Sequence, residues 1–207
     1  MGKKITLFVD VDNTIYNSTK SVVKYLNQKY GTSVDYRNVK GYNFKDEFPE
    51  VEEDEVEKIF EEPLFYFQPG CIYYDALLNL NLLYSLNKCN INFVTLGTTT
   101  NLENKRHWID MVCDMEDVPF WKMEYIDFYG STDKSCDKSF VDMSGGIFID
   151  DNIDCLRSSN AKVKILIKNN VDTKWNEIKP NEEIYVVNTW DEILKIIDFF
   201  YKNREMM

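Results

Sequence analysis

Pairs of aspartates follow two apolar segments of the sequence, and carboxylates at this spacing can do chemistry. Asp10 and Asp12 come directly after one segment, and Asp150 and Asp151 come directly after another. Where a strand opens into a loop, residues i and i+2 can face one pocket, so one aspartate could attack a substrate or bind a metal while the other transfers a proton. A capped turn is the alternative interpretation of the first pair, and for the second pair the alternative is that Asp151 or Asn152 caps the following helix.

The two pairs of carboxylates predict a cation between them. Four acids at two strand ends, with no lysine or arginine near them in sequence, would repel one another. A site that offers a small number of hard oxygen ligands and room for water favours Mg²⁺ over Ca²⁺ or zinc. The chain has one histidine, His107, which excludes a pair of histidine ligands. Its five cysteines include no Cys-x-x-Cys pair, so we expect reduced thiols rather than a zinc site or a disulfide framework.

Two further segments carry groups suited to a phosphoryl ligand. Thr95 ends an apolar segment and is followed by a glycine and three threonines, so its hydroxyl is placed to hydrogen-bond a phosphoryl oxygen. The three threonines are better explained as helix caps. A lysine upstream of Asp150 could neutralise charge on a transferring group. Lys134 and Lys138 are the candidates, and we favour Lys138 because two apolar residues follow soon after it.

These residues are positioned by an alternation of short apolar segments and helical patterns, which predicts an α/β fold with a doubly wound parallel sheet. In such sheets ligands bind at the carboxyl ends of the strands. The expected strands are 5–9, 91–95, 125–129, 146–149, 163–167 and 184–187, and the expected helices are 75–86, 102–112, 153–160 and 190–201.

One interval, 17–74, breaks the alternation and predicts a mainly helical insertion. It holds helical patterns at 20–30 and 52–62, many aromatic residues, and no convincing buried strand. We expect it to form a small cap over the sheet edge, with residues 1–16 and 75–207 forming the core. Ordinary crossover helices are the alternative.

Composition narrows the class of protein further. The chain of 207 residues carries 24 lysines and arginines against 35 acids, a net charge of −11, which disfavours binding to polymeric nucleic acid. We expect no membrane segment, because no segment reaches 18 uninterrupted apolar residues. The apolar stretch before Asp10 is too short for a signal peptide, so we expect a cytoplasmic protein.

The order of these motifs resembles that of the haloacid dehalogenase-like (HAD) phosphohydrolase superfamily. The series is Asp10-x-Asp12-x-Thr14, then Thr95, then Lys138, then Asp150-Asp151. The resemblance implies a Rossmann-like core with a helical cap inserted after the first motif, in agreement with the insertion described above.

A narrower resemblance is to the 5′(3′)-deoxyribonucleotidase family. It rests on short segments outside the motifs, namely 63–66 with 69–70, 137–141, 163–167 with 175–176, and 188–190. The sequence departs from that family at Asn13, where the family usually carries glycine.

The superfamily resemblance also implies a mechanism. Asp10 would attack phosphorus to form an aspartyl-phosphate, and Asp12 would protonate the leaving alcohol and then activate water. Asp10, the backbone carbonyl of Asp12, and Asp150 would hold Mg²⁺. Asp151 would act through water or as a support for the metal site. Thr95 and Lys138 would hold the other phosphoryl oxygens.

The narrower resemblance implies that the substrate is a nucleoside monophosphate that loses its 5′-phosphate. Phe44, Phe65, Tyr66 and Phe67 are candidates for stacking on a base, although packing within the cap is the alternative for each. Thr98 is a further candidate contact. Three other functions stay open: a HAD phosphatase for a sugar phosphate or a polynucleotide 3′-phosphate, a phosphotransferase, and a non-catalytic binding protein with the same fold.

Overall fold

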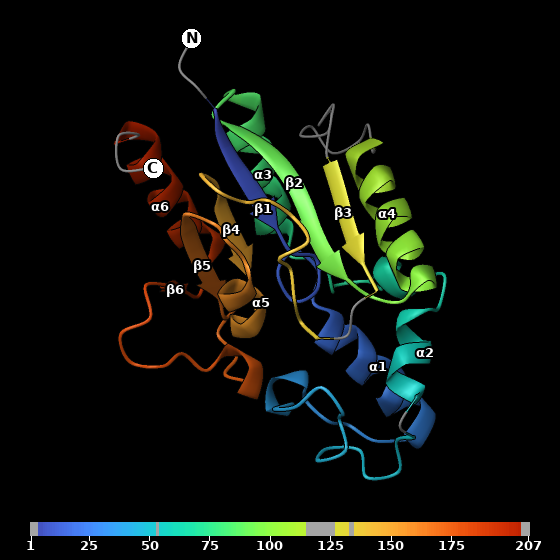
Figure 1. Ribbon diagram of the computed structural model, residues 1–207. Helices are drawn as coiled ribbons and strands as arrows, with labels where there is room; N and C mark the ends of the chain where they lie inside the picture. Colours follow the sequence, from blue (N-terminus) through green and yellow to red (C-terminus); the bar gives the residue numbers. More distant parts are fainter. Residues whose placement is uncertain (1–3, 53, 115–126, 133–134, 204–207) are drawn as a thin grey trace.

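The computed structural model (Figure 1) describes residues 4–52, 54–114, 127–132 and 135–203. A six-stranded parallel sheet with the strand order β3-β2-β1-β4-β5-β6 forms its centre. The strands are apolar along most of their length because helices and loops cover both faces of the sheet. Their bounds are β1 (Ile5–Val9), β2 (Cys89–Leu96), β3 (Asp127–Ser131), β4 (Ile147–Asp150), β5 (Val163–Ile167) and β6 (Tyr185–Val187).

The register of the central strands decides which side chains meet at the carboxyl edge. Val9 of β1 pairs with Phe93 of β2 on one side and with Ile149 of β4 on the other. Asp10 and Asp150, each one residue further along, therefore lie next to each other. Thr95 follows two residues after Phe93, at the same edge.

Alternate residues of the strands face two separate cores. Leu7 and Val9 belong to the larger core, and Phe8 belongs to the smaller one. The larger core is covered by α3 (Tyr74–Ser85), α4 (Thr99–Asp114) and α6 (Trp190–Lys202). The short α5 (Ile153–Ser158) covers the smaller core on the opposite face. The sheet is therefore doubly wound, as predicted.

The segment between β1 and α3 is helical and contains no strand among its described residues. It forms α1 (Ser18–Tyr30), α2 (Glu55–Phe60) and two 3₁₀ turns, Tyr36–Asn38 and Phe65–Phe67. Figure 1 shows α1 and α2 beyond the carboxyl ends of β1 and β2. This is the position expected of a cap, although the division into a core and a separate cap domain stays a prediction.

The predicted elements agree with the observed ones apart from small differences at their ends. The strands at 5–9 and 163–167 have the predicted bounds. The strand predicted at 125–129 is observed as Asp127–Ser131, and residues 125 and 126 lie outside the described part of the chain. The helix predicted at 52–62 ends earlier, at Phe60, because Pro63 disfavours helical backbone in the residue before it. None of the helices within the described residues is long and apolar enough to cross a membrane.

Candidate active site

The chain turns sharply after β1 and places two carboxylates, those of Asp10 and Asp12, at the sheet edge. Asp10 is almost fully buried, and its backbone N–H donates to the carbonyl of Ile149 (2.9 Å). Asn13 has a φ of 53°, in the left-handed region that asparagine tolerates better than most residues. Its side-chain oxygen accepts from the backbone N–H of Thr19 (3.0 Å). Asparagine therefore suits the turn at the position where deoxyribonucleotidases carry glycine.

Asp10, Asp150 and Asp151 form a buried acidic cluster. One carboxylate oxygen from each lies within 4.8 Å of the others. Burial is the largest influence on all three and raises their pKa values, and repulsion between the carboxylates raises them further. When all three carboxylates are ionised they face one lysine ammonium, and the two remaining negative charges are what a divalent cation would balance. Buried oxygen donors with this imbalance fit Mg²⁺.

Lys138 lies between two of these acids. Its buried ammonium donates to Asp10, to Asp150 (2.7 Å) and to the carbonyl of Val94 (2.9 Å). Burial opposes the charged form, but the two carboxylates outweigh it and raise the pKa of Lys138. Lys138 is therefore an integral part of the acidic cluster, and its predicted role in holding a phosphoryl oxygen stays a prediction. The competing candidate, Lys134, lies outside the described residues.

Asp12 has different neighbours from the other three aspartates. Its carboxylate is paired with the ammonium of Lys105 (2.6 Å) and accepts a hydrogen bond from the Tyr66 hydroxyl (3.1 Å). Its side chain does not take part in the acidic cluster found among the described residues. This agrees with the expected role of Asp12, in which only its backbone carbonyl would contact the metal.

Lys105 is a site residue that the sequence analysis missed. It lies on α4, is fully buried, and also donates to the Thr95 hydroxyl (2.8 Å) and to the Leu96 carbonyl (2.5 Å). The helical periodicity contained the signal, because Lys105 is spaced four residues after buried Asn101 and three before buried Trp108. A lysine on the buried face of a helix needs a buried acid as its partner.

Tyr66, a candidate for base stacking or for packing within the cap, is buried and its hydroxyl donates to Asp12. Its hydroxyl accepts from the amide of Asn101 (2.9 Å) while donating to Asp12. Its ring is fully buried against Tyr16, with ring centroids 5.0 Å apart. Tyr66 thus connects the segment between β1 and α3 to Asp12.

Asp151 is held by a residue from a distant loop. The Trp175 indole N–H donates to its carboxylate (2.7 Å), and the Tyr42 ring stacks on Trp175 with centroids 4.3 Å apart and an interplanar angle of 18°. The same loop contacts Lys40, whose ammonium donates to the carbonyl of Asp172 (2.7 Å). Asp151 therefore has a direct partner in Trp175 and an indirect connection to residues 40–42.

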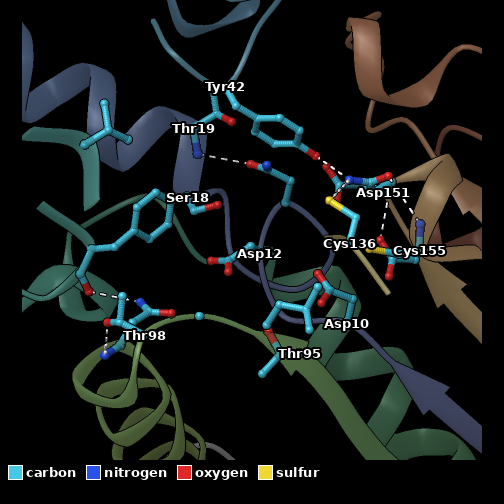
Figure 2. A pocket seen from close by; sticks show the side chains of 18 of the residues that line it. Asp10, Asp12, Ser18, Thr19, Tyr42, Thr95, Thr98, Cys136, Asp151 and Cys155 are labelled. Atoms are coloured by element: carbon cyan, nitrogen blue, oxygen red, sulfur yellow. Dashed lines mark hydrogen bonds between the residues drawn. The ribbon is translucent and has the colours of Figure 1, made fainter. Parts of the chain in front are cut away.

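The predicted catalytic and metal-binding residues line one cavity of about 440 Å³, and the predicted substrate residues Phe44 and Thr98 are also on its wall. Figure 2 shows Asp10, Asp12 and Thr95 around the same space. Thr98 also caps α4 by accepting from the N–H of Asn101 (3.2 Å), and its hydroxyl donates to Glu61 (2.6 Å).

Two of the predicted substrate residues are placed elsewhere by the structure. Phe65 is buried against Tyr16 and Phe60. Phe67 lies near His107, with ring centroids 6.0 Å apart. Neither is among the residues that line the cavity.

Comparison with known proteins adds information about the fold. No protein-family model and no curated protein matches the sequence. Among solved structures, a haloacid dehalogenase-like family hydrolase from Streptococcus pneumoniae is 16% identical with a TM-score of 0.55, over 93% of this chain and 98% of that one. A magnesium-bound HAD-hydrolase from Bacillus subtilis is 14% identical with a TM-score of 0.53, over 95% and 100%.

A third structure, described as a predicted phosphoglycolate phosphatase from Haemophilus somnus, is 13% identical with a TM-score of 0.54, over 95% of this chain and 99% of that one. None of these three is described as a deoxyribonucleotidase, so the narrower resemblance stays a prediction. The near-complete coverage of each chain means that the likeness includes both the sheet and the segment inserted after β1. The chain has the α/β fold of the HAD-superfamily hydrolases.

Proposed function

We propose that the protein is a Mg²⁺-dependent phosphomonoesterase that works through an aspartyl-phosphate on Asp10. The observation that carries this proposal is the meeting of Asp10, Asp12, Thr95, Lys138 and Asp150 around one cavity at the carboxyl edge of the sheet. A buried nucleophile, a separate carboxylate for proton transfer, and a lysine and a threonine for the phosphoryl oxygens are together what hydrolysis of a phosphate ester requires.

The residues divide the reaction into two displacements. A carboxylate oxygen of Asp10 forms a bond to phosphorus as the ester P–O bond breaks, and Asp12 gives its proton to the leaving alcohol. Water then attacks the same phosphorus, Asp12 takes a proton from that water, and the bond between phosphorus and Asp10 breaks to release phosphate. Asp12 is suited to this exchange because its side chain is directed away from the acidic cluster and is one quarter exposed.

Side chains of the protein can stabilise the negative charge of the substrate's phosphoryl group. Lys138 lies against Asp10 and Asp150, and the Thr95 hydroxyl lies at the end of β2, so both can donate to phosphoryl oxygens. Asp10, Asp150 and the backbone carbonyl of Asp12 would hold Mg²⁺, with Asp151 supporting the site. When bound, the cation would neutralise charge on the nucleophile and on the phosphoryl group.

A (deoxy)nucleoside monophosphate is the substrate class that we favour. The cavity of about 440 Å³ lies within the range of ligand pockets, roughly 300–1,000 Å³. Tyr42, Phe44 and Phe60 line it and could contact a base. Polar groups on the same wall, including Thr98 and Asn101, support the second candidate, a smaller sugar phosphate or phosphoglycolate-like ester whose hydroxyl or carboxylate groups they could bind.

A substrate panel with one site variant tests this proposal. Phosphate release with Mg²⁺ would be measured on nucleoside 5′- and 3′-monophosphates, sugar phosphates, phosphoglycolate and 3′-phosphorylated oligonucleotides. Asp10→Asn should abolish turnover, and EDTA should do the same to the wild type. Asp110→Asn, which changes an exposed acid of α4, is the matched control and should remain active.

The outcomes separate the candidate functions. Full activity of Asp10→Asn would exclude the covalent mechanism, and activity that survives EDTA would exclude the metal. Preference for sugar phosphates or phosphoglycolate over nucleotides would replace the favoured substrate class while leaving the chemistry in place. Transfer of phosphate to an added alcohol would indicate a phosphotransferase.

A further inference from the structure

Two cysteines face each other on the wall of the cavity. Cys136 is half-buried and lies two residues before Lys138, and Cys155 is buried in α5, shortly after Asp151. Both line the cavity, and Figure 2 shows their sulfur atoms next to Asp151. The two thiols interact, because a hydrogen bond between them lowers the pKa of Cys136 and raises that of Cys155.

The backbones of the two cysteines are also held together. The hydroxyl of Ser158 accepts from the backbone N–H of Lys138 (2.8 Å) and donates to the carbonyl of Cys155 (2.9 Å). The carbonyl of Cys136 lies 3.5 Å from the same hydroxyl. A disulfide requires Cα atoms about 4.4–6.8 Å apart and sulfurs that face each other. The Ser158 hydroxyl places the backbones of the two cysteines beside each other, which is the arrangement from which such a bridge could form.

Cys136 has the features of the reactive member of the pair. The hydrogen bond from Cys155, supported by one from the Asn152 amide (3.6 Å), lowers the pKa of the Cys136 thiol to about 6 in spite of its burial. Its φ of 56° is unusual for cysteine, and such backbone conformations concentrate at functional sites. By contrast, Cys71 and Cys89 are fully buried, and burial raises the pKa of the Cys71 thiol.

We propose that Cys136 and Cys155 are a redox-active pair that peroxides oxidise to an intramolecular disulfide. The Cys136 thiolate attacks one oxygen of hydrogen peroxide, the O–O bond breaks, and hydroxide leaves and is protonated to water. The sulfur of Cys155 then attacks the Cys136 sulfenic acid, its S–H proton is lost, and a second water leaves. In total two thiols and one peroxide give one disulfide and two waters, and an external dithiol reverses the reaction.

The disulfide would act on residues next to the phosphatase site. Forming an S–S bond of about 2.05 Å turns the Cys136 sulfur away from the Asn152 amide and draws the segment 136–138 towards α5. Lys138 is part of that segment. Oxidation should therefore lower turnover by displacing the Lys138 ammonium from Asp10 and Asp150, a consequence that rests on the proposed function.

Peptide mapping tests the pair directly, without reference to activity. Wild-type protein would be treated with hydrogen peroxide, alkylated and digested with trypsin. Cleavage after Lys134, Lys138 and Arg157 places the two cysteines on separate peptides, 135–138 and 139–157. We expect these peptides joined, two hydrogens lighter than their sum, and separated again by dithiothreitol. Cys89→Ser, the control, should give the same joined peptide.

Single variants distinguish the roles of the two thiols. Cys155→Ser should leave Cys136 as a sulfenic acid that dimedone traps, whereas Cys136→Ser should leave Cys155 unmodified. Peroxide treatment that joins other cysteines instead, or that leaves Cys136 no more reactive than Cys89, would overturn the proposal. Phosphate release measured in parallel should fall on oxidation and recover with dithiothreitol. A joined peptide in a protein without phosphatase activity on any ester would count against the proposed function and in favour of the redox pair.

Discussion

Lys105 provides a direct test of which contacts position the site residues. It belongs to none of the sequence motifs, yet in the structure it connects Asp12 to the end of β2. Its ammonium contacts the Asp12 carboxylate, the Thr95 hydroxyl and the Leu96 carbonyl, all within 2.8 Å. The change Lys105→Met removes this charge while keeping most of the side-chain length and volume. It leaves Asp12 without its only cationic partner among the described residues.

The expected loss of stability follows from the burial of the two partners. Removing one member of a buried ion pair costs about 3–5 kcal/mol. Lys105 is fully buried, but the Asp12 side chain is 25% exposed, so water can solvate part of its charge. We therefore expect the free energy of unfolding to fall by about 3 kcal/mol, at the lower end of that range. Because Lys105 also fixes Asp12, kcat should fall about 100-fold, the loss that follows a misplacement of about 1 Å.

Urea unfolding and steady-state phosphate release together measure these two effects. Arg106→Ala is the matched control, because Arg106 is the next residue on α4, forms an exposed pair with Asp110 and lies over the Phe128 ring, away from Asp12. Exposed helix pairs of this kind contribute about 0.3–0.5 kcal/mol, and the control should keep its activity. A Lys105→Met variant that unfolds at the same urea concentration as wild type, and that turns over at the wild-type rate, would refute the reasoning.

Three further predictions concern the metal site, acid stability and strand packing. Trp175→Phe removes the N–H donor to Asp151, so Mg²⁺ affinity measured by calorimetry should fall about 10- to 100-fold, and unchanged affinity would contradict this role. Burial opposes ionisation of Glu55, but hydrogen bonds from Lys29 and a neighbouring tyrosine lower its pKa below the ordinary 4.5. Its ionised form therefore stabilises the fold at pH values above 4.5, and this contribution is lost as the pH falls through the lowered pKa. The difference in the free energy of unfolding between wild type and Glu55→Gln should therefore shrink in acid. A difference that stays constant with pH would argue against this role of Glu55. Gly146→Ala would place a Cβ 2.6 Å from the phenylalanine ring of β1. The free energy of unfolding, measured by urea denaturation, should fall by about 1–3 kcal/mol. An unchanged urea midpoint would show that the ring can move aside.

Most of the fold could be predicted because its elements depend on local patterns. Parallel strands buried on both faces are nearly continuous apolar segments, and all six predicted strands are present. The acidic pairs could be assigned to one edge because parallel strands end on the same side. The choice of Lys138 over Lys134 agrees with the contacts of Lys138 to Asp10 and Asp150.

The remaining site residues could not be predicted from local patterns because they come from distant segments. Trp175 reaches Asp151 from 24 positions away, and Tyr66 reaches Asp12 from 54 positions away. Phe65 and Tyr66 are adjacent aromatic residues and both are buried, so aromatic composition alone could not show that the second also reaches a carboxylate. That distinction depends on the turn geometry of the 3₁₀ segment.

The stacking of Tyr42 on Trp175 couples the position of the segment between β1 and α3 to the arrangement of the acidic cluster. Any opening that separates residues 40–42 from the loop 172–175 must break the stack and the Lys40 hydrogen bond, and it leaves Trp175, the donor to Asp151, without its support. Thermodynamic linkage is reciprocal. If the cluster binds a cation as proposed, a ligand that favours the closed segment should tighten cation binding, and the cation should favour closure to the same extent.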